Sequence, residues 1–130
     1  MEQQGLADGK PYINKKADGE EYSVPYAGQP YFVSEFGGIW WNEAEARQAA
    51  GVAGTDVESS WGYGQRVSSE EEFYTRFDGL CGVLLENPDM FGYCYTQLTD
   101  VFQEKNGIFT FDRSPKFDLE RIRASQLRRG

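Results

Sequence analysis

Two β-prone segments alternate with two helical patterns along this chain, and that order is the feature that most constrains its fold. Residues 29–36 form a short β-prone run that a Gly37-Gly38 turn signal closes, and residues 91–98 form a second such run. A helical pattern follows each of them, at about residues 68–87 and about residues 117–127. Strands that alternate with helices in this way pair in parallel through right-handed crossovers, as in a barrel or a doubly wound sheet. The sequence therefore predicts an α/β fold.

The first helical pattern has both a start and a stop signal. Ser68 with Glu71, or Ser69 with Glu72, forms a capping box immediately before the first apolar position. Asn87-Pro88 marks the end of the helix. Between these signals the apolar residues recur at helical spacing, at Phe73, Phe77, Leu80, Cys81 and Leu84.

Two strands alone make no complete sheet. Parallel strands normally need helices on both faces of their sheet, so we expect the chain either to be a fragment of a larger α/β protein or to dock on one. Residues 1–28 are polar, punctuated by glycine and without periodicity, which is typical of a loop. We therefore predict a lead-in segment at 1–28 and a folded α/β segment at 29–130.

The charge of the chain disfavours two classes of partner. Thirteen basic residues against twenty-one acidic ones give a net charge of −8, and the resulting field repels nucleic acid and anionic membranes. We expect neither as a partner. No apolar stretch approaches the ~20 residues that span a bilayer, and the N-terminus lacks the pattern of a signal peptide. The sequence does not decide the cellular compartment, and it slightly favours the cytoplasm.

The absence of histidine limits the chemistry of the chain. It excludes Ser-His and Cys-His nucleophile pairs and histidine-based zinc sites within these residues. Cys81 and Cys94 have neither metal-site spacing nor the density of a disulfide scaffold, so we expect packed free thiols. Any acid/base catalysis by this chain must therefore use carboxylates, tyrosine, lysine or cysteine. We predict no metal and no cofactor.

Glu35 closes the first predicted strand, and two glycines and two tryptophans follow it within six residues. A barrel strand delivers a catalytic carboxylate to the carboxyl-terminal face of its barrel in this arrangement. A solvated or structurally paired glutamate has the same local pattern. The pattern around Glu35 alone therefore leaves both roles open.

Two motifs make the interpretation specific. Residues 29–38, Gln-Pro-Tyr-Phe-Val-Ser-Glu-Phe-Gly-Gly, resemble the seventh-strand motif of family 2 glycoside hydrolases, the β-galactosidase- and β-glucuronidase-like enzymes, in which the glutamate is the nucleophile. Residues 92–101, together with 104–108 and Asp112-Arg113, are similar to the eighth strand of that family and the loop after it.

The resemblance covers about residues 26–122 and implies a fold and a role. The chain would form the last two βα units of a (β/α)₈ TIM barrel, from strand 7 to helix 8, and residues 29–130 would be the C-terminal quarter of the catalytic domain. Glu35 would be the nucleophile of an O-glycosyl hydrolase. The substrate would be a β-glycoside or oligosaccharide.

The chemistry of a retaining glycosidase requires a second carboxylate, about 5 Å from the nucleophile. In the family, this acid/base glutamate follows an asparagine at the end of the fourth strand, in a part of the barrel that would precede Met1. Asn42-Glu43 repeats the dipeptide, but the helix-favouring residues 43–47 indicate a helix start. We therefore expect the chain to lack the acid/base and to need the missing N-terminal part of its barrel as a partner.

Aromatic residues mark both ends of the long loop at residues 39–67. Trp40 and Trp41 lie at one end, and Trp61 and Tyr63 at the other. Loops of this length are usually functional or disordered, and tryptophans favour function. Flat rings stack on the apolar face of a pyranose, so we predict substrate contacts for the three tryptophans, with packing against the barrel rim as the alternative.

The second strand offers two more candidates for substrate binding. Tyr95 and Gln97 share one side of their strand by its two-residue period, so both could face the barrel interior near its open end. By resemblance, Tyr95 would occupy the pocket-floor position that relatives often fill with tryptophan. Gln97 fits a core layer equally well.

The choice of sugar rests on one short element. Glucuronidase relatives place Asn-x-Lys after the eighth strand to hold the sugar carboxylate, and here residues 106–108 read Asn-Gly-Ile. Residues 14–16 read Asn-Lys-Lys but precede the seventh strand. The sequence therefore favours a β-galactoside over a β-glucuronide. The rival hypothesis is a stand-alone, non-catalytic carbohydrate-binding module, in which Glu35 only accepts a hydrogen bond from a sugar hydroxyl.

Overall fold

The computed structural model describes residues 16–20, 27–52 and 58–127, and the chain divides into residues 1–30 and 31–130, each of which is described by itself. In the first part, residues 16–20 form a turn in which the Gly19 N–H donates to the Lys16 carbonyl at 2.9 Å. The Asn-Lys dipeptide at 14–15 lies outside the described residues.

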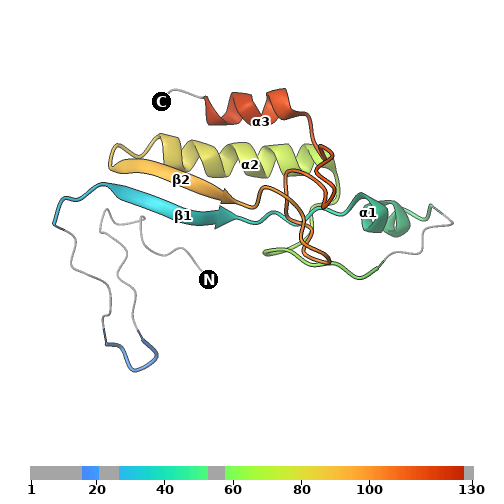
Figure 1. Ribbon diagram of the computed structural model, residues 1–130, viewed down its shortest axis with the longest axis horizontal. Coiled ribbons are helices and arrows are strands. Elements are labelled where there is room, and N and C mark those ends of the chain that lie inside the picture. Colours follow the sequence, from blue (N-terminus) through green and yellow to red (C-terminus); the bar gives the residue numbers. More distant parts are fainter. Residues whose placement is uncertain (1–15, 21–26, 53–57, 128–130) are drawn as a thin grey trace. The chain divides into compact units, whose positions relative to one another are not determined.

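The described residues contain β1 (Tyr31–Gly37), α1 (Glu43–Ala49), α2 (Glu70–Leu85), β2 (Met90–Thr96) and α3 (Leu119–Gln126), in that order (Figure 1). β1 and β2 pair in parallel, which confirms the predicted pairing of the two strands. The boundaries of these elements lie within a few residues of those predicted from the sequence. The unit formed by residues 31–130 is therefore a small α/β fold.

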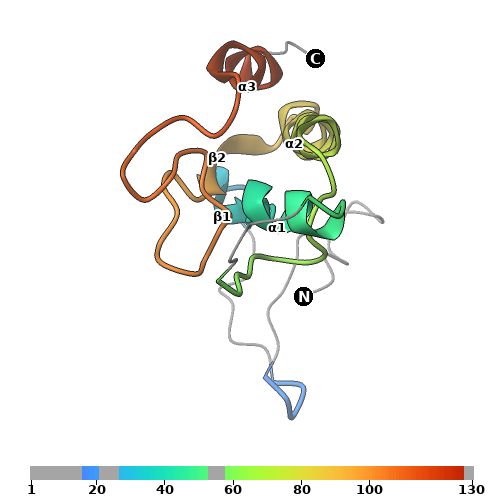
Figure 2. The same cartoon turned by 90° about the vertical axis from the view of Figure 1, so that its right-hand side faces the viewer.

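α2 and α3 run back against the direction of the strands (Figure 1). α2 packs against the sheet and α3 packs against α2 (Figures 1 and 2). The carboxyl ends of β1 and β2 lie at the same edge, where the loops that follow the two strands also gather. Among the described residues, none of the helices has the length and apolar character that a membrane span requires.

Local signals set the start of α2. The Ser69 hydroxyl accepts a hydrogen bond from the Glu72 N–H at 3.2 Å, as an N-cap does. The Glu72 carboxylate in turn accepts from the N–H and the hydroxyl of Ser68, at 2.8 and 2.7 Å. These hydrogen bonds from Ser68 lower the pKa of Glu72. The structure thus selects Ser69 with Glu72 from the two predicted capping boxes.

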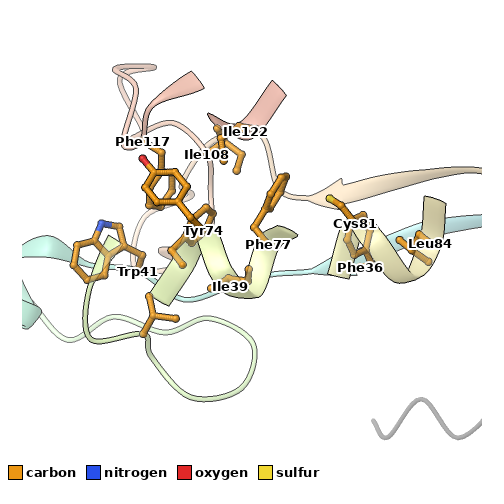
Figure 3. Close-up of a cluster of buried hydrophobic side chains, with 12 residues drawn as sticks. Phe36, Ile39, Trp41, Tyr74, Phe77, Cys81, Leu84, Ile108, Phe117 and Ile122 are labelled. Atoms are coloured by element: carbon orange, nitrogen blue, oxygen red, sulfur yellow. The ribbon is translucent and has the colours of Figure 1, made fainter. Parts of the chain in front are cut away.

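Apolar side chains from β1, α2, α3 and the two long loops form one core (Figure 3). The fully buried ring of Phe73 stacks on Phe117 with the ring centroids 3.7 Å apart, and it also stacks on Phe77 at 5.8 Å. The other buried members are Phe36, Ile39, Trp41, Val67, Tyr74, Cys81, Leu84, Ile108 and Ile122.

Two residues that the sequence assigned to sugar binding belong to this core. Trp41 is 6% exposed, so burial among apolar side chains accounts for it. The Tyr95 ring packs edge-on against Phe36 and Phe77, on the face of the sheet that α2 covers. Helices cover the outside of a (β/α)₈ barrel. The expectation that Tyr95 faces a barrel interior is therefore wrong, because its ring packs under α2.

The two cysteines are free, as expected, but only one of them is packed. Cys81 is buried under the sheet, whereas Cys94 is exposed. Cys94 lies between Tyr93 and Tyr95, whose rings contact the core on the α2 side. Side chains alternate along a strand, so Cys94 faces away from α2.

Exposed aromatic side chains lie near the start of the two strands, and Phe32 faces away from α2 because it precedes Val33, which packs against the core. Phe32 and Phe91 are 51% and 75% exposed, and their ring centroids lie 6.4 Å apart. Gly92 lies directly under the Phe32 ring, since a Cβ there would be 2.9 Å from Phe32 Cε2. Large apolar side chains left open in this way are typical of a surface that another element covers.

We expect Phe73→Ala to lower the free energy of unfolding by about 3–5 kcal/mol, because it removes a fully buried ring and leaves a cavity against Phe117. Val83→Ala is the matched control on the same helix, since Val83 is 63% exposed. Its expected cost is below about 0.5 kcal/mol. Denaturant unfolding followed by circular dichroism measures both. Similar losses in the two variants would contradict the central place of Phe73.

Candidate functional site

Glu35 lies in a β-bulge near the end of β1. Val33 pairs with Tyr93 and Phe36 pairs with Tyr95, so β1 advances by three positions while β2 advances by two. One extra residue is therefore accommodated between Val33 and Phe36. Bulges of this kind re-aim a side chain and are frequent next to active sites.

The bulge decides which way Glu35 points. Strict alternation from Val33 would place Glu35 on the face that α2 covers. Instead, Phe36 is buried in the core against which Val33 packs, and Glu35 is exposed. The two-residue period fails at this point of the strand, and its failure leaves the carboxylate open to solvent or to a ligand.

The phenol of Tyr63 binds the Glu35 carboxylate. Its hydroxyl donates to Glu35 Oε1 at 3.2 Å, and its backbone N–H donates to the Gly38 carbonyl at 2.9 Å. The negative charge of Glu35, followed by this hydrogen bond, raises the pKa of Tyr63. The phenol therefore stays protonated at neutral pH and remains a donor.

Two glycines allow the strand end and the two tyrosine rings to approach each other. Gly37 and Gly38 have φ angles of 89° and 59°, in the left-handed region that glycine adopts without strain. A Cβ on Gly38 would lie 1.7 Å from Tyr63 Cδ2, and one on Gly37 would lie 2.3 Å from Tyr95 Cε2. The Gly37-Gly38 signal is thus required by both the backbone and the packing.

Trp61 lies beside Tyr63 on a segment that pairs with the loop after β2. The Trp61 N–H donates to the Gln103 carbonyl at 2.9 Å, and the Trp61 carbonyl accepts from the Lys105 N–H at 2.8 Å. The rings of Trp61 and Tyr63 are 6.4 Å apart at 75°, and about half of each is exposed. This exposed aromatic pair can pack against the apolar face of a sugar ring.

Trp40 is held within the long loop. Its indole Nε1 donates to Ser60 Oγ at 2.9 Å, and a Cβ on Gly62 would lie 2.4 Å from Trp40 Cβ. Ser60 Oγ also donates to Glu45 Oε1 at 2.8 Å, which ties the loop to α1. These contacts fit the loop-packing alternative for Trp40, and a sugar contact by this residue stays a prediction.

Asn42-Glu43 begins α1. Asn42 Oδ1 accepts from the N–H groups of Ala44 and Glu45, at 3.1 and 3.4 Å, as an N-cap does. Glu43 is exposed, and its carboxylate lies 3.6 Å from Nη1 of Arg47 one turn later. The dipeptide is therefore a helix start, as the sequence predicted.

Gln97 and Tyr95, the two candidates on the second strand pattern, make their hydrogen bonds to backbone groups of the loops that follow the strands. The Gln97 N–H donates to the Asn106 carbonyl at 3.4 Å, and the buried Gln97 Nε2 has no hydrogen-bond partner among the described residues. The Tyr95 hydroxyl accepts from the Ile39 N–H at 3.1 Å. Burial raises the pKa of Tyr95. Tyr95 thus supports the backbone after the strand from within the core.

Sequence reasoning did not assign two residues of this site. Tyr63 was noted among the loop aromatics, but no local signal links it to Glu35, which lies 28 positions away. Glu104 lies in the segment 104–108 that resembles the loop after the eighth strand of the family, but the sequence assigns it no role. It forms a bridge with Trp61, and its carboxylate accepts from Asn106 Nδ2 at 3.1 Å.

Within the part of the chain that the structure describes, no group of three or more His, Cys, Asp or Glu side chains is placed to hold a metal ion. No family model matches the sequence, and no curated protein does. The site combines an exposed carboxylate, a protonated phenol bound to it and an exposed aromatic pair.

We expect Glu35→Gln to lower the pKa of Tyr63 toward its ordinary value, because a neutral amide no longer opposes the charge of the phenolate. Glu43→Gln, on α1, is the matched control and should leave the Tyr63 titration as in the wild type. Titration of the tyrosine ring carbons by ¹³C NMR measures the pKa. An unchanged Tyr63 pKa in Glu35→Gln would contradict the contact between the two side chains.

Proposed function

We propose that this chain supplies the nucleophile strand and part of the sugar pocket of a retaining β-glycosidase. The observation that most directly supports this proposal is the bulge of β1, which turns Glu35 away from the core at the carboxyl end of a parallel strand. There the Tyr63 hydroxyl donates a hydrogen bond to Glu35. The motif at residues 29–38 resembles the nucleophile motif of family 2 glycoside hydrolases and supports the same role. β1 and β2 would then be strands 7 and 8 of a (β/α)₈ barrel.

The proposed reaction has two steps. A Glu35 oxygen attacks the anomeric carbon, and the glycosidic bond breaks as its electron pair passes to the leaving oxygen, which a second carboxylic acid protonates. Water then attacks the anomeric carbon, gives its proton to that second carboxylate and releases Glu35. The configuration at the anomeric carbon is retained because it inverts twice.

The second carboxylate is assigned to the missing N-terminal part of the barrel. Asn42-Glu43 is used as a helix start, and the Glu43 carboxylate lies close to Arg47. The exposed Phe32 on the face opposite α2, with the exposed Phe91 ring 6.4 Å away, supports a partner of this kind, since a barrel interior is filled by inward-pointing side chains. The chain combined with that missing part is called the assembled barrel below.

Tyr63 is proposed to position the nucleophile. Its hydroxyl donates to one Glu35 oxygen at 3.2 Å, which leaves the other oxygen free to attack. Charge-assisted bonds of this type fix the orientation of a carboxylate. The Trp61 ring beside Tyr63 would pack on the sugar. A β-galactoside is favoured over a β-glucuronide because residues 106–108 lack the lysine of Asn-x-Lys.

Covalent labelling tests the proposal. A mechanism-based 2-fluorogalactoside should accumulate as a glycosyl ester on Glu35 of the assembled barrel, and peptide mass spectrometry locates the label. Tyr63→Phe should slow labelling without moving it to another residue. A label on any other carboxylate would remove Glu35 as the nucleophile.

The exposed aromatic pair favours a second candidate function, a non-catalytic carbohydrate-binding module. About half of each of the Trp61 and Tyr63 rings is exposed, and the neighbouring Glu35 can accept a hydrogen bond from a sugar hydroxyl. Saturable sugar binding by the chain, together with no label on Glu35 in the assembled barrel, would favour this module over the glycosidase.

A further inference from the structure

A charged pocket lies between the start of α1 and the loop after β2. Its volume is about 330 Å³, within the range of roughly 300–1,000 Å³ that small-molecule sites occupy. Glu35, Tyr63 and Trp61 are not among the described residues that line it. The pocket is therefore a different place from the proposed nucleophile site. The lining residues that matter for its chemistry are Trp41, Glu43, Asp100, Lys105, Pro115 and Lys116.

Backbone hydrogen bonds hold the walls of this pocket together. The Trp41 N–H donates to the Lys105 carbonyl at 2.9 Å, which joins the segment before α1 to the loop after β2. The Lys116 N–H donates to the Ile108 carbonyl at 3.1 Å, which joins two parts of that loop. The pocket is therefore formed by the fold itself, as small-molecule sites usually are.

A buried ion pair lines the pocket. Asp100 and the Lys116 side chain are 3% and 8% exposed, and Lys116 Nζ donates to Asp100 Oδ1 at 2.8 Å. The same oxygen accepts from the Gly107 N–H at 3.0 Å. Lys105 Nζ lies 3.8 Å from the other oxygen, Asp100 Oδ2. Two ammonium groups thus share one buried carboxylate.

The groups that stay open in this cluster are hydrogen-bond donors. An ammonium group carries three donors and no acceptor. Lys116 Nζ uses two of its three, on Asp100 and on the Lys105 carbonyl, which lies 3.3 Å away. Lys105 Nζ makes no hydrogen bond to any residue that the structure describes, and its side chain is 31% exposed. The pocket therefore offers positively charged N–H groups to a ligand oxygen.

The balance of charge favours an anion with a single negative charge. Lys105 and Lys116 together exceed Asp100 by one positive charge, and the Glu43 carboxylate lies 3.6 Å from Nη1 of Arg47. The whole chain carries a net charge of −8, which opposes a multiply charged anion more strongly than a singly charged one. A carboxylate fits this balance better than a doubly charged phosphate.

We propose that this pocket binds a small monocarboxylate with an apolar body. The ammonium groups of Lys105 and Lys116 hold the carboxylate through charge-assisted hydrogen bonds. The apolar body packs against Trp41 and Pro115, which complete the lining. This site does not depend on the glycosidase assignment, because it uses none of the groups around Glu35.

Benzoate titrations of the full ¹⁵N-labelled chain test the site, with benzamide as the neutral analogue. Benzoate should cause saturable shifts of the Trp41 indole and the Lys105 backbone N–H. Benzamide should bind at least tenfold more weakly, because it lacks the charge that the ammonium groups recognise. Inorganic phosphate is the third probe, and it should bind more weakly than benzoate.

Lys105→Gln is the informative variant. It should weaken benzoate binding about threefold to tenfold, the effect of one lost hydrogen bond to a charged group. Lys116→Met is less suitable, because it leaves the Asp100 carboxylate buried without its partner and would destabilise the fold. Arg123→Gln is the matched control, since it removes an exposed positive charge from α3 and should leave benzoate binding as in the wild type.

Four results would overturn the inference. They are equal affinity for benzoate and benzamide, an unchanged dissociation constant in Lys105→Gln, the absence of a saturable shift of the Trp41 indole, and tighter binding of phosphate than of benzoate. The nucleophile role is judged separately, by the label on Glu35 in the assembled barrel. Failure of this site and failure of the proposed function can therefore be told apart.

Discussion

Glu35→Gln in the assembled barrel is expected to reduce kcat for an aryl β-galactoside roughly 10⁴-fold or more. The amide is nearly isosteric with the carboxylate and lies on an exposed bulge, so the core around Phe36 should keep its packing. The amide cannot attack the anomeric carbon, and the covalent step is lost. Steady-state kinetics on a nitrophenyl β-galactoside measure the loss.

Two controls make this result specific to the nucleophile. Glu43→Gln removes an exposed carboxylate of α1 that lies beside Arg47, and should leave kcat near the wild-type value. Circular dichroism and denaturant unfolding should show that Glu35→Gln retains the wild-type fold. A Glu35→Gln variant that is folded and still turns over at a rate near that of the wild type would exclude Glu35 from the chemistry.

The secondary structure could be predicted because its signals are local. Ser69 and Glu72 cap α2 with side chains that lie three positions apart, and Asn87-Pro88 follows its end directly. The parallel pairing of β1 with β2 followed from the intervening helix, which a crossover connection requires.

The direction of the Glu35 side chain could not be predicted from the sequence. It depends on whether Glu35 or Phe36 occupies the next buried position on the α2 side of the strand. Val33 packs against the core, and both Glu35 and Phe36 compete for the next position on that face. Burial of a phenylalanine ring is worth about 1.5–3 kcal/mol, whereas burial of an unpaired carboxylate is strongly unfavourable. The strand therefore adopts a bulge, which a strict period of two does not anticipate.

The orientation of the Tyr95 side chain was predicted wrongly for a similar reason, because it too depends on tertiary packing. The two-residue period places Tyr95 with Tyr93 on one side of β2, but it does not say which side α2 covers. That face is set by tertiary packing of Phe77 against Tyr95. Tyr63 and Glu104 were missed for a related reason, because they reach the site through contacts between two loops that are distant in the sequence.

From the proposed function, this chain alone is expected not to hydrolyse aryl β-glycosides above background, whereas adding the proposed N-terminal part of a barrel should restore activity by complementation. The motivation is that, among the residues the structure describes, Glu35 is the exposed carboxylate at the end of β1. General acid assistance commonly contributes ~10²–10⁴-fold, and Glu43, the sequence alternative, serves α1. Without the partner, Glu35 and the open sheet face around Phe32 also remain in water, and the substrate is poorly positioned.

The assay compares the purified chain, its Glu35→Gln variant and the chain mixed with the upstream part, all on a nitrophenyl β-galactoside. Turnover should occur only in the mixture, and Glu35→Gln should abolish it there. Glu104 forms a backbone bridge with Trp61, whose ring centroid lies 6.4 Å from that of Tyr63, so Glu104→Gln of the chain alone is the informative further variant. Turnover by the isolated chain that depends on both Glu35 and Glu104 would contradict the assignment of the acid to the missing part and would place a complete carboxylate pair within these residues.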